Sequence, residues 1–128
     1  SGLVANCLAW NEDEACLDPD RSGKLVETWV HNELAIRCEL SDGCALSHYR
    51  DSAKREIDFL VENGSGHLLG IEVKAGSSVR SDDFVHLHWF RDNLARGKFV
   101  GIVLYAGSQT VPFGPDFYAV PLGALANG

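Results

Sequence analysis

Residues 55–74 read REIDFLVENGSGHLLGIEVK, and the predicted fold depends on this stretch. Two apolar runs flank the turn-forming residues 63–66, a pattern typical of a β-hairpin. A three-residue loop at 64–66 brings the apolar faces of the two strands together, whereas a slip of one residue would turn one of them over. The apolar side chains that alternate along the two strands are Ile57, Phe59, Val61, Leu69, Ile71 and Val73.

Three charged residues interrupt these apolar runs, namely Asp58, Glu72 and Lys74. In the predicted register Asp58 lies directly opposite Glu72, and Lys74 lies two residues further, about 7 Å along the same face. Opposed carboxylates repel each other, so a sheet built only for stability would avoid them. A divalent cation between the two carboxylates would turn this repulsion into a binding site.

The composition is that of one globular domain. With 128 residues the chain can bury a core, and its 45% apolar and 23% charged residues exclude a disordered protein. No apolar run approaches the ~20 residues that cross a bilayer, and no secretory signal is visible, so we expect a cytoplasmic protein without a membrane partner. The chain has no methionine, even at its first position, which predicts a piece of a longer protein.

The net charge of −7 disfavours long-range attraction to nucleic acid, although it leaves room for a local basic patch. The cysteines lack the C-x-x-C spacing and the paired histidines of a zinc site. A chain with this much core does not depend on disulfides, so we expect free thiols in a reducing cytosol. This prediction covers Cys7, Cys16, Cys38 and Cys44.

The other predicted elements lie on both sides of the hairpin. Residues 1–22 are expected to be a lead-in or the tail of a preceding domain, and residues 23–128 form the domain itself. An apolar arc at helical spacing predicts a helix over 24–40, and an N-cap at Ser81 begins a second helix that runs to about Ala95. The predicted strands are 44–50, 55–62, 67–74, 99–105 and 117–120.

Strand 99–105 is apolar without alternation, as in a strand that is covered on both faces. Strand, helix and buried strand in succession imply a right-handed crossover, so strand 99–105 should lie parallel to the strand that carries Glu72. The prolines around 117–120 favour an edge strand. The predicted fold is therefore α/β, with a mixed sheet flanked by helices in the order α-β-β-β-α-β-β.

Glu27 falls at the margin of the apolar arc of helix 24–40 and joins Asp58, Glu72 and Lys74 as a candidate site residue. Carboxylates hold Mg²⁺ through oxygen ligands, and the ion polarises a phosphate and lowers the pKa of its bound water. Lys74 can neutralise developing charge or position the water. These residues suit metal-assisted phosphodiester cleavage, and the alternative is a solvated sheet face with a cross-strand salt bridge.

Four basic residues could form a rim near this site. They are Arg50, Lys54, Arg55 and Arg80. Basic side chains at such a rim are expected to contact the phosphates of a nucleic acid. A solvated run of charges is the alternative interpretation for all four.

The order of the elements and the acidic residues together resemble the PD-(D/E)XK nuclease superfamily, whose fold is restriction-endonuclease-like. The residues that carry this resemblance are Glu27, Asp58 and Glu72-Val73-Lys74. A longer series of motifs resembles the DUF4143 family, the C-terminal, nuclease-like portion of prokaryotic AAA-type ATPases. These motifs are Leu25-Val26-Glu27-x-x-Val30-x-Asn32-Glu33-Leu34, His48-Tyr49-Arg50-Asp51, Arg55-Glu56-Ile57-Asp58-Phe59, Gly70-Ile71-Glu72-Val73-Lys74-Ala75, Val103-Leu104-Tyr105-Ala106-Gly107 and Tyr118-Ala119-Val120-Pro121-Leu122.

The resemblance implies a restriction-endonuclease-like, metal-dependent nuclease domain at residues 23–128. Asp58 and Glu72 would ligate Mg²⁺ or Mn²⁺ together with the main-chain carbonyl of Val73. Glu27 would be an additional acid, also within reach of the metal, and Lys74 would be the catalytic lysine. The implied partners are a nucleic acid, with DNA expected, and an N-terminal ATPase domain that is absent from this chain.

The chain departs from the superfamily pattern in two places. No proline precedes Asp58, and no glutamine occupies the predicted helix after Lys74. The phosphate-binding pattern G-x-x-x-x-G-K-[ST] of an ATPase does not occur in this chain either. The alternative function is a catalytically inactive DNA-binding or regulatory module attached to an AAA-type ATPase.

Overall fold

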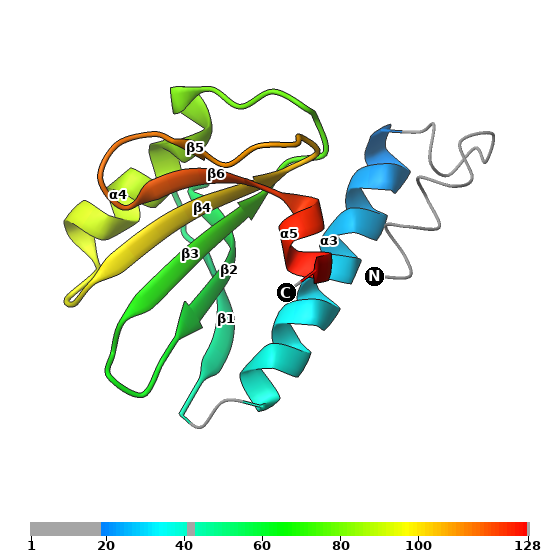
Figure 1. The fold of residues 1–128 in the computed structure, drawn as a ribbon. Coiled ribbons are helices and arrows are strands. Elements are labelled where there is room, and N and C mark those ends of the chain that lie inside the picture. Colours follow the sequence, from blue (N-terminus) through cyan, green and yellow to red (C-terminus); the bar gives the residue numbers. More distant parts are fainter. Residues whose placement is uncertain (1–18, 41–42, 128) are drawn as a thin grey trace.

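The computed structural model of the protein describes residues 19–40 and 43–127 (Figure 1). It has the predicted mixed α/β architecture, in which helices flank a six-stranded sheet. The elements in chain order are α3 (Pro19–Glu39), β1 (Ala45–Arg50), β2 (Glu56–Glu62), β3 (Leu68–Val73), the 3-10 helix η1 (Ser81–Phe84), α4 (Val85–Asn93), β4 (Phe99–Tyr105), β5 (Val111–Pro112), β6 (Phe117–Pro121) and α5 (Leu122–Asn127).

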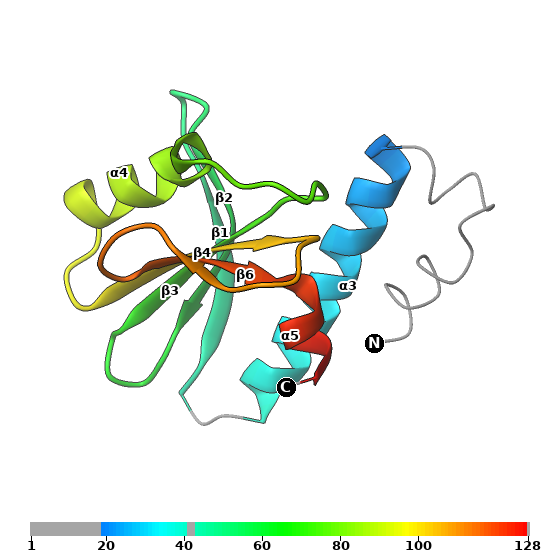
Figure 2. The same ribbon diagram turned by 45° about the horizontal axis from the view of Figure 1, so that its top comes forward.

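The sheet separates two hydrophobic cores, with α4 on one face and with α3 and α5 on the other (Figures 1 and 2). Strand β4 contributes to both cores. Val103, 1% exposed, packs in the core beneath α4, and its neighbour Leu104, 4% exposed, packs in the core beneath α3. The prediction that this strand is covered on both faces is therefore confirmed.

The strand order is β1-β2-β3-β4-β6-β5. β4 pairs parallel with β3, with Glu72 opposite Val103, so the predicted crossover is confirmed. The prediction of an edge strand at 117–120 is wrong, because β6 pairs with β4 on one side and with β5 on the other. The true edge is the two-residue strand β5, which is too short to show an alternating pattern in the sequence.

The β2–β3 hairpin has the predicted register, with Phe59 opposite Ile71 and Val61 opposite Leu69. Its turn closes where the Asn63 amide donates to the His67 carbonyl over 3.1 Å. Gly66 has a φ of 81°, a left-handed conformation that glycine adopts without steric cost. The apolar pattern and the glycine therefore determine the register together.

The alternation of β2 is interrupted at Asp58. Ile57 packs in the core beneath α4, whereas Phe59 packs in the core beneath α3. The prediction that these two residues share a face is wrong. The pairing of β1 with β2 is irregular at the same place, between Ser47 and Tyr49, and such an irregularity bends and twists a strand.

The predicted helices occur with changed boundaries. α3 begins at Pro19, before the predicted start at residue 24, and buries Val26, Val30 and Leu34. The second predicted helix is divided into η1 and α4. Over residues 19–40 and 43–127, no helix is long and apolar enough to cross a membrane.

A disulfide joins Cys38, near the end of α3, to Cys44, just before β1. The prediction of free thiols is wrong for these two residues, and Cys7 and Cys16 lie outside the described residues. The Cα atoms of Cys38 and Cys44 lie 5.3 Å apart, within the range of a disulfide. The prediction failed because it weighed only whether the core needed a cross-link.

Candidate functional site

Asp58 and Glu72 meet where the backbone ladder of the hairpin ends, after the Phe59–Ile71 pair. The Asp58 amide donates to Glu72 Oε1 over 3.2 Å, and the Val73 amide donates to Asp58 Oδ2 over 2.8 Å. Each carboxylate thus accepts a hydrogen bond from an amide of the opposite strand. The interruption of β2 gives both side chains this position, because a regular strand would pair these amides with carbonyls or solvent.

The pKa values of Asp58 and Glu72 are both raised, so both carboxyls are harder to ionise than in water. Burial, followed by the negative charge of Asp58, raises the pKa of Glu72 to about 8, and the hydrogen bond from the Asp58 amide opposes this rise. Burial also raises the pKa of Asp58, against the hydrogen bond from the Val73 amide and with a further rise from Glu56. A divalent cation bound between the two carboxyl groups would stabilise their ionised forms.

Glu27 reaches the same region from α3. Partial burial, followed by the charges of Asp58 and Glu56, raises the pKa of the Glu27 carboxyl. The structure therefore brings the helix acid close enough to Asp58 for the two charges to interact. Within the described ranges 19–40 and 43–127, however, no group of three or more His, Cys, Asp and Glu side chains is placed to hold a metal ion.

A groove runs between α3 and the strands β1 and β2. Glu27, His31 and Phe59 line both a cavity of about 350 Å³ and an adjoining cavity of about 520 Å³. Asp58 also lines the first cavity, and Lys24 also lines the second. The groove thus leads along α3 to one member of the carboxylate pair.

Two oxygen donors on adjacent strands fit the chemistry of Mg²⁺ or Mn²⁺. Asp58 and Glu72 are close enough for their charges to interact, and Asp58 faces a groove that a phosphate could enter. Val73, whose main-chain carbonyl is the third predicted ligand, donates its amide to Asp58. The residues present therefore fit a divalent ion held by the pair and completed by ligands from solvent or substrate.

Lys74 lies next to the pair, but its ammonium binds another carboxylate. Lys74 Nζ is 2.9 Å from Asp83 Oδ2, and both side chains are about one-third exposed, at 34% and 28%. Asp83 belongs to η1 and also accepts the Arg80 amide over 2.8 Å. The sequence pattern of 81–83 predicts a helix cap and does not reveal this ion pair.

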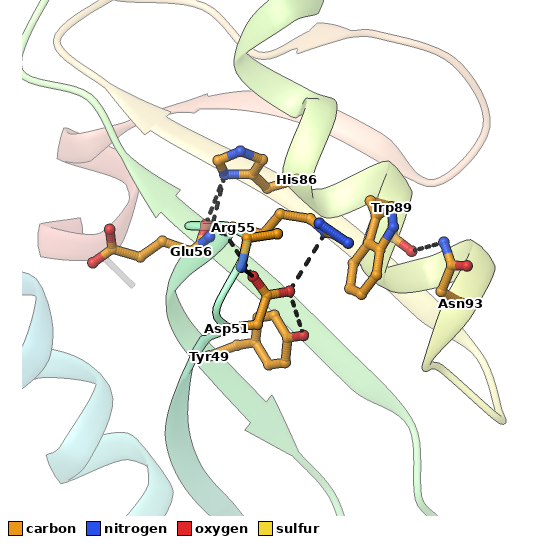
Figure 3. A network of polar contacts seen from close by, with 8 residues as sticks. Tyr49, Asp51, Arg55, Glu56, His86, Trp89 and Asn93 are labelled. Carbon is orange, nitrogen blue, oxygen red and sulfur yellow. Dashed lines mark hydrogen bonds and ion pairs between the residues drawn. The ribbon is translucent and has the colours of Figure 1, made fainter.

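Two of the four predicted phosphate contacts are made by arginines that interact with other side chains of the protein. Arg50 pairs with Glu56 over 2.7 Å, and the guanidinium of Arg55 lies 3.8 Å from the centre of the Trp89 ring. Figure 3 shows Asp51 between Arg55 and Tyr49, which both contact its carboxylate. These contacts hold the two arginines beside the start of β2.

The turn of residues 51–55 is fixed by Asp51. Its Oδ1 accepts the amides of Ala53 and Arg55 over 2.9 and 3.1 Å. These bonds allow Lys54 a left-handed φ of 65°, which is uncommon for a residue other than glycine. Lys54 is consequently presented at the tip of an ordered, exposed turn.

Sequence reasoning missed the links between α4 and the hairpin. His86 Nδ1 lies 3.3 Å from the amide nitrogen and 3.1 Å from the carbonyl oxygen of Glu56 (Figure 3). His88 stacks on Phe117 with a centroid distance of 3.9 Å. The two-residue spacing of His86 and His88 on a helix does not reveal the bridge from His86 to Glu56.

The fold and the site define a mixed α/β domain with a half-buried carboxylate pair at the end of a hairpin. The chain belongs to the DUF4143 family, described as a domain of unknown function, whose profile matches residues 22–125. No protein with a curated description matches the chain.

One solved structure with a similar fold is the refined half-complex from the tetradecameric assembly of Thermococcus gammatolerans McrB AAA+ hexamers with bound McrC. The match has a TM-score of 0.52 and 12% identity, and covers 77% of this chain. This chain corresponds to 27% of the length of that chain. At this identity the likeness establishes the fold alone.

Proposed function

We propose that this domain is a metal-dependent nuclease of the PD-(D/E)XK type that cleaves phosphodiester bonds of nucleic acid, with DNA as the expected substrate. The observation that carries the proposal is the Asp58–Glu72 pair, two half-buried carboxylates that each accept an amide of the opposite strand, with Asp58 lining a groove. A pair with raised pKa values stabilises the sheet poorly, so its presence favours a function.

In this proposal Asp58 and Glu72 hold Mg²⁺ or Mn²⁺. When bound, the ion would polarise the phosphate and activate a water molecule. Glu27, which lines the groove from α3, would orient that water by accepting a hydrogen bond from it or from a neighbouring water molecule. Lys74 would place a positive charge where the leaving oxygen or the phosphate gains negative charge.

The substrate would approach along the groove between α3 and β1–β2. Arg50, which lines this groove, and the exposed Lys54 and Arg80 would contact phosphates, whereas Arg55 is held against Trp89. The similar structure contains AAA+ hexamers, which supports an ATPase partner for this domain. A cytoplasmic location would fit a nuclease that acts on DNA with such a partner.

The second candidate function is a regulatory or interaction module of an ATPase that performs no chemistry. Two observations favour it. The carboxylates already accept amides of the neighbouring strands, and Lys74 is paired with Asp83. A module of this kind needs no metal, so metal binding separates the two candidates.

The test compares the wild type with Lys74→Ala and Asp58→Asn on single-stranded and duplex DNA, with Mg²⁺, Mn²⁺ or EDTA. The nuclease proposal predicts metal-dependent cleavage that both substitutions reduce by at least about a hundredfold. Lys98→Ala is the matched control, because Lys98 is an exposed lysine before β4. Equal cleavage by Lys74→Ala and Lys98→Ala would contradict the catalytic role, and no binding of either ion would favour the regulatory module.

A further inference from the structure

The ion pair between Lys74 and Asp83 joins the end of β3 to the 3-10 helix η1, across the connection of residues 75–80. Lys74 follows β3, and Asp83 lies in η1. Their side chains meet at 2.9 Å in a partly buried place, where an ion pair is less screened than on the open surface. Asp83 is thus the carboxylate that determines where the proposed catalytic ammonium lies.

The carboxylate of Asp83 is itself held in place. It accepts the Arg80 amide over 2.8 Å, and the Asp83 amide donates to the Arg80 carbonyl over 2.9 Å. The next residue, Phe84, is 1% exposed and packs in the core beneath α4. Asp83 therefore offers a fixed acceptor that is anchored to the core.

The backbone of Lys74 is fixed as well. Its amide donates to the Leu104 carbonyl over 2.7 Å, and the Ala106 amide donates to the Gly76 carbonyl over 2.9 Å. The flexible part is the four-carbon side chain, which loses rotamer freedom when its end is bound. An acceptor at the far end therefore selects one position for the ammonium.

The selected position lies close to the carboxylate pair. Lys74 is two residues from Glu72 along an extended backbone, so the two side chains leave the same face of the sheet. An ammonium has three donors, so Lys74 can keep its bond to Asp83 and still donate to a phosphate oxygen. An Asp83–Lys74 unit could thus act on a substrate held at Asp58 and Glu72.

We infer that Asp83 is a positioning residue, which acts through Lys74 by holding its ammonium beside the Asp58–Glu72 pair. This inference rests on the proposed nuclease function. The neighbouring Asp82 provides a matched control, since it is an exposed aspartate in the same 3-10 helix.

The first arm of the test measures the ion pair without reference to activity. The folded protein is labelled briefly with an amine-acylating reagent, and the extent of labelling at each lysine is read by mass spectrometry. Asp83→Asn should raise the labelling rate of Lys74 about fivefold, whereas Asp82→Asn should leave it unchanged. An unchanged rate in Asp83→Asn would overturn the inference.

The second arm is a double-mutant cycle on DNA cleavage with Lys74→Met, Asp83→Asn and the combined variant. Asp83→Asn should slow cleavage about tenfold to a hundredfold in the wild type and have no further effect in Lys74→Met. Asp83→Glu, which keeps a carboxylate, should recover part of the rate, and circular dichroism checks that each variant is folded.

The outcomes separate the inference from the function on which it rests. Additive losses would show that Asp83 acts without Lys74, and faster cleavage by Asp83→Asn would show that the ion pair restrains the lysine. Either result overturns the positioning role alone. A wild type that binds no metal and does not cleave overturns the proposed function, and the positioning role with it, even if the labelling arm detects the ion pair.

Discussion

Glu72 connects the stability of the sheet to its proposed chemistry. Burial, and then the neighbouring charge of Asp58, raise the pKa of Glu72 to about 8, so the protein favours the protonated carboxyl. A metal ion favours the ionised form, because only a carboxylate is a good ligand. The same side chain therefore stabilises the metal-free domain when neutral and could bind an ion when charged.

The first prediction concerns stability and pH. The pKa of Glu72 lies above its ordinary value of 4.5, so its contribution to stability is complete below about pH 4.5 and is lost as the pH rises through about 8. The loss is at most about 5 kcal/mol. In EDTA, urea unfolding should show that Glu72→Gln, which imitates the neutral form, gains stability over the wild type between about pH 5 and about pH 9.

Glu62→Gln is the control for this comparison, because Glu62 is an exposed glutamate at the far end of β2. Its difference from the wild type should stay constant over the same pH range. A constant difference for Glu72→Gln would mean that Glu72 ionises as easily in the folded protein as in the unfolded chain.

Among the site residues, sequence reasoning identified the pair but not its surroundings. Periodicity and loop length are local properties, and they predicted the register of the hairpin up to the Phe59–Ile71 pair, next to which Asp58 and Glu72 lie. Asp83 of η1 contacts Lys74, nine residues away, and His86 of α4 contacts Glu56, 30 residues away. Contacts of this kind depend on how the helix docks, which periodicity alone does not specify.

At the scale of elements, the hairpin is the best predicted part of the fold. Its turn carries a second signal, because Asn63 Oδ1 accepts the amides of Ser65 and His67 over 2.9 and 3.0 Å. An asparagine at this position therefore replaces part of the backbone hydrogen bonding of the turn.

The second prediction is that Asn63→Ala lowers the free energy of unfolding by about 1 kcal/mol, because two turn amides lose their acceptor. Asn63→Asp, which keeps an acceptor oxygen, should lose less than half as much. Chemical denaturation measures both values. Ser65→Ala is the control from the same exposed turn, and an equal loss in that variant would attribute the effect to the turn in general.

The third prediction concerns the disulfide, which joins α3 and β1, the two elements that form walls of the groove. It closes a short loop, so the double variant Cys38→Ser/Cys44→Ser should lower the free energy of unfolding by about 2 kcal/mol in the chain-entropy view. The measurement is urea denaturation with and without reductant.

Reductant should bring the wild type close to the level of this variant. The variant keeps Cys7 and Cys16, so its own response to reductant shows what those residues contribute. If the wild type and the variant unfold alike under oxidising conditions, the disulfide has no stabilising role.

At the scale of the whole molecule, the layered architecture was predictable and the ends of the elements were not. The apolar run 99–105 and the crossover rule placed β4 correctly. Strand β5 and helix α5 are too short to carry a clear sequence pattern. Their formation depends on packing against the rest of the fold. The disulfide was missed because the distance between Cys38 and Cys44 is a property of the folded chain, which the prediction did not consider.

The charge of the whole chain leads to the last prediction. The net charge is −7, and Glu27, Glu56, Asp58 and Glu72 interact around the groove. Any added salt should stabilise the domain slightly by screening this repulsion. An ion held by the pair would add RT ln(1 + [Mg²⁺]/Kd), which is about 1 kcal/mol when Mg²⁺ is at about five times its Kd.

The measurement is thermal unfolding in MgCl₂ and in NaCl at matched ionic strength, which screens the surface charges equally. The wild type should unfold at a higher temperature in MgCl₂, and Asp58→Asn/Glu72→Gln should remove this difference, because amides replace both charged ligands. Glu62→Gln removes one negative charge away from the pair and should keep it. If the double variant retains the full advantage of Mg²⁺, the ion acts through general charge, and the pair has no role as a metal site.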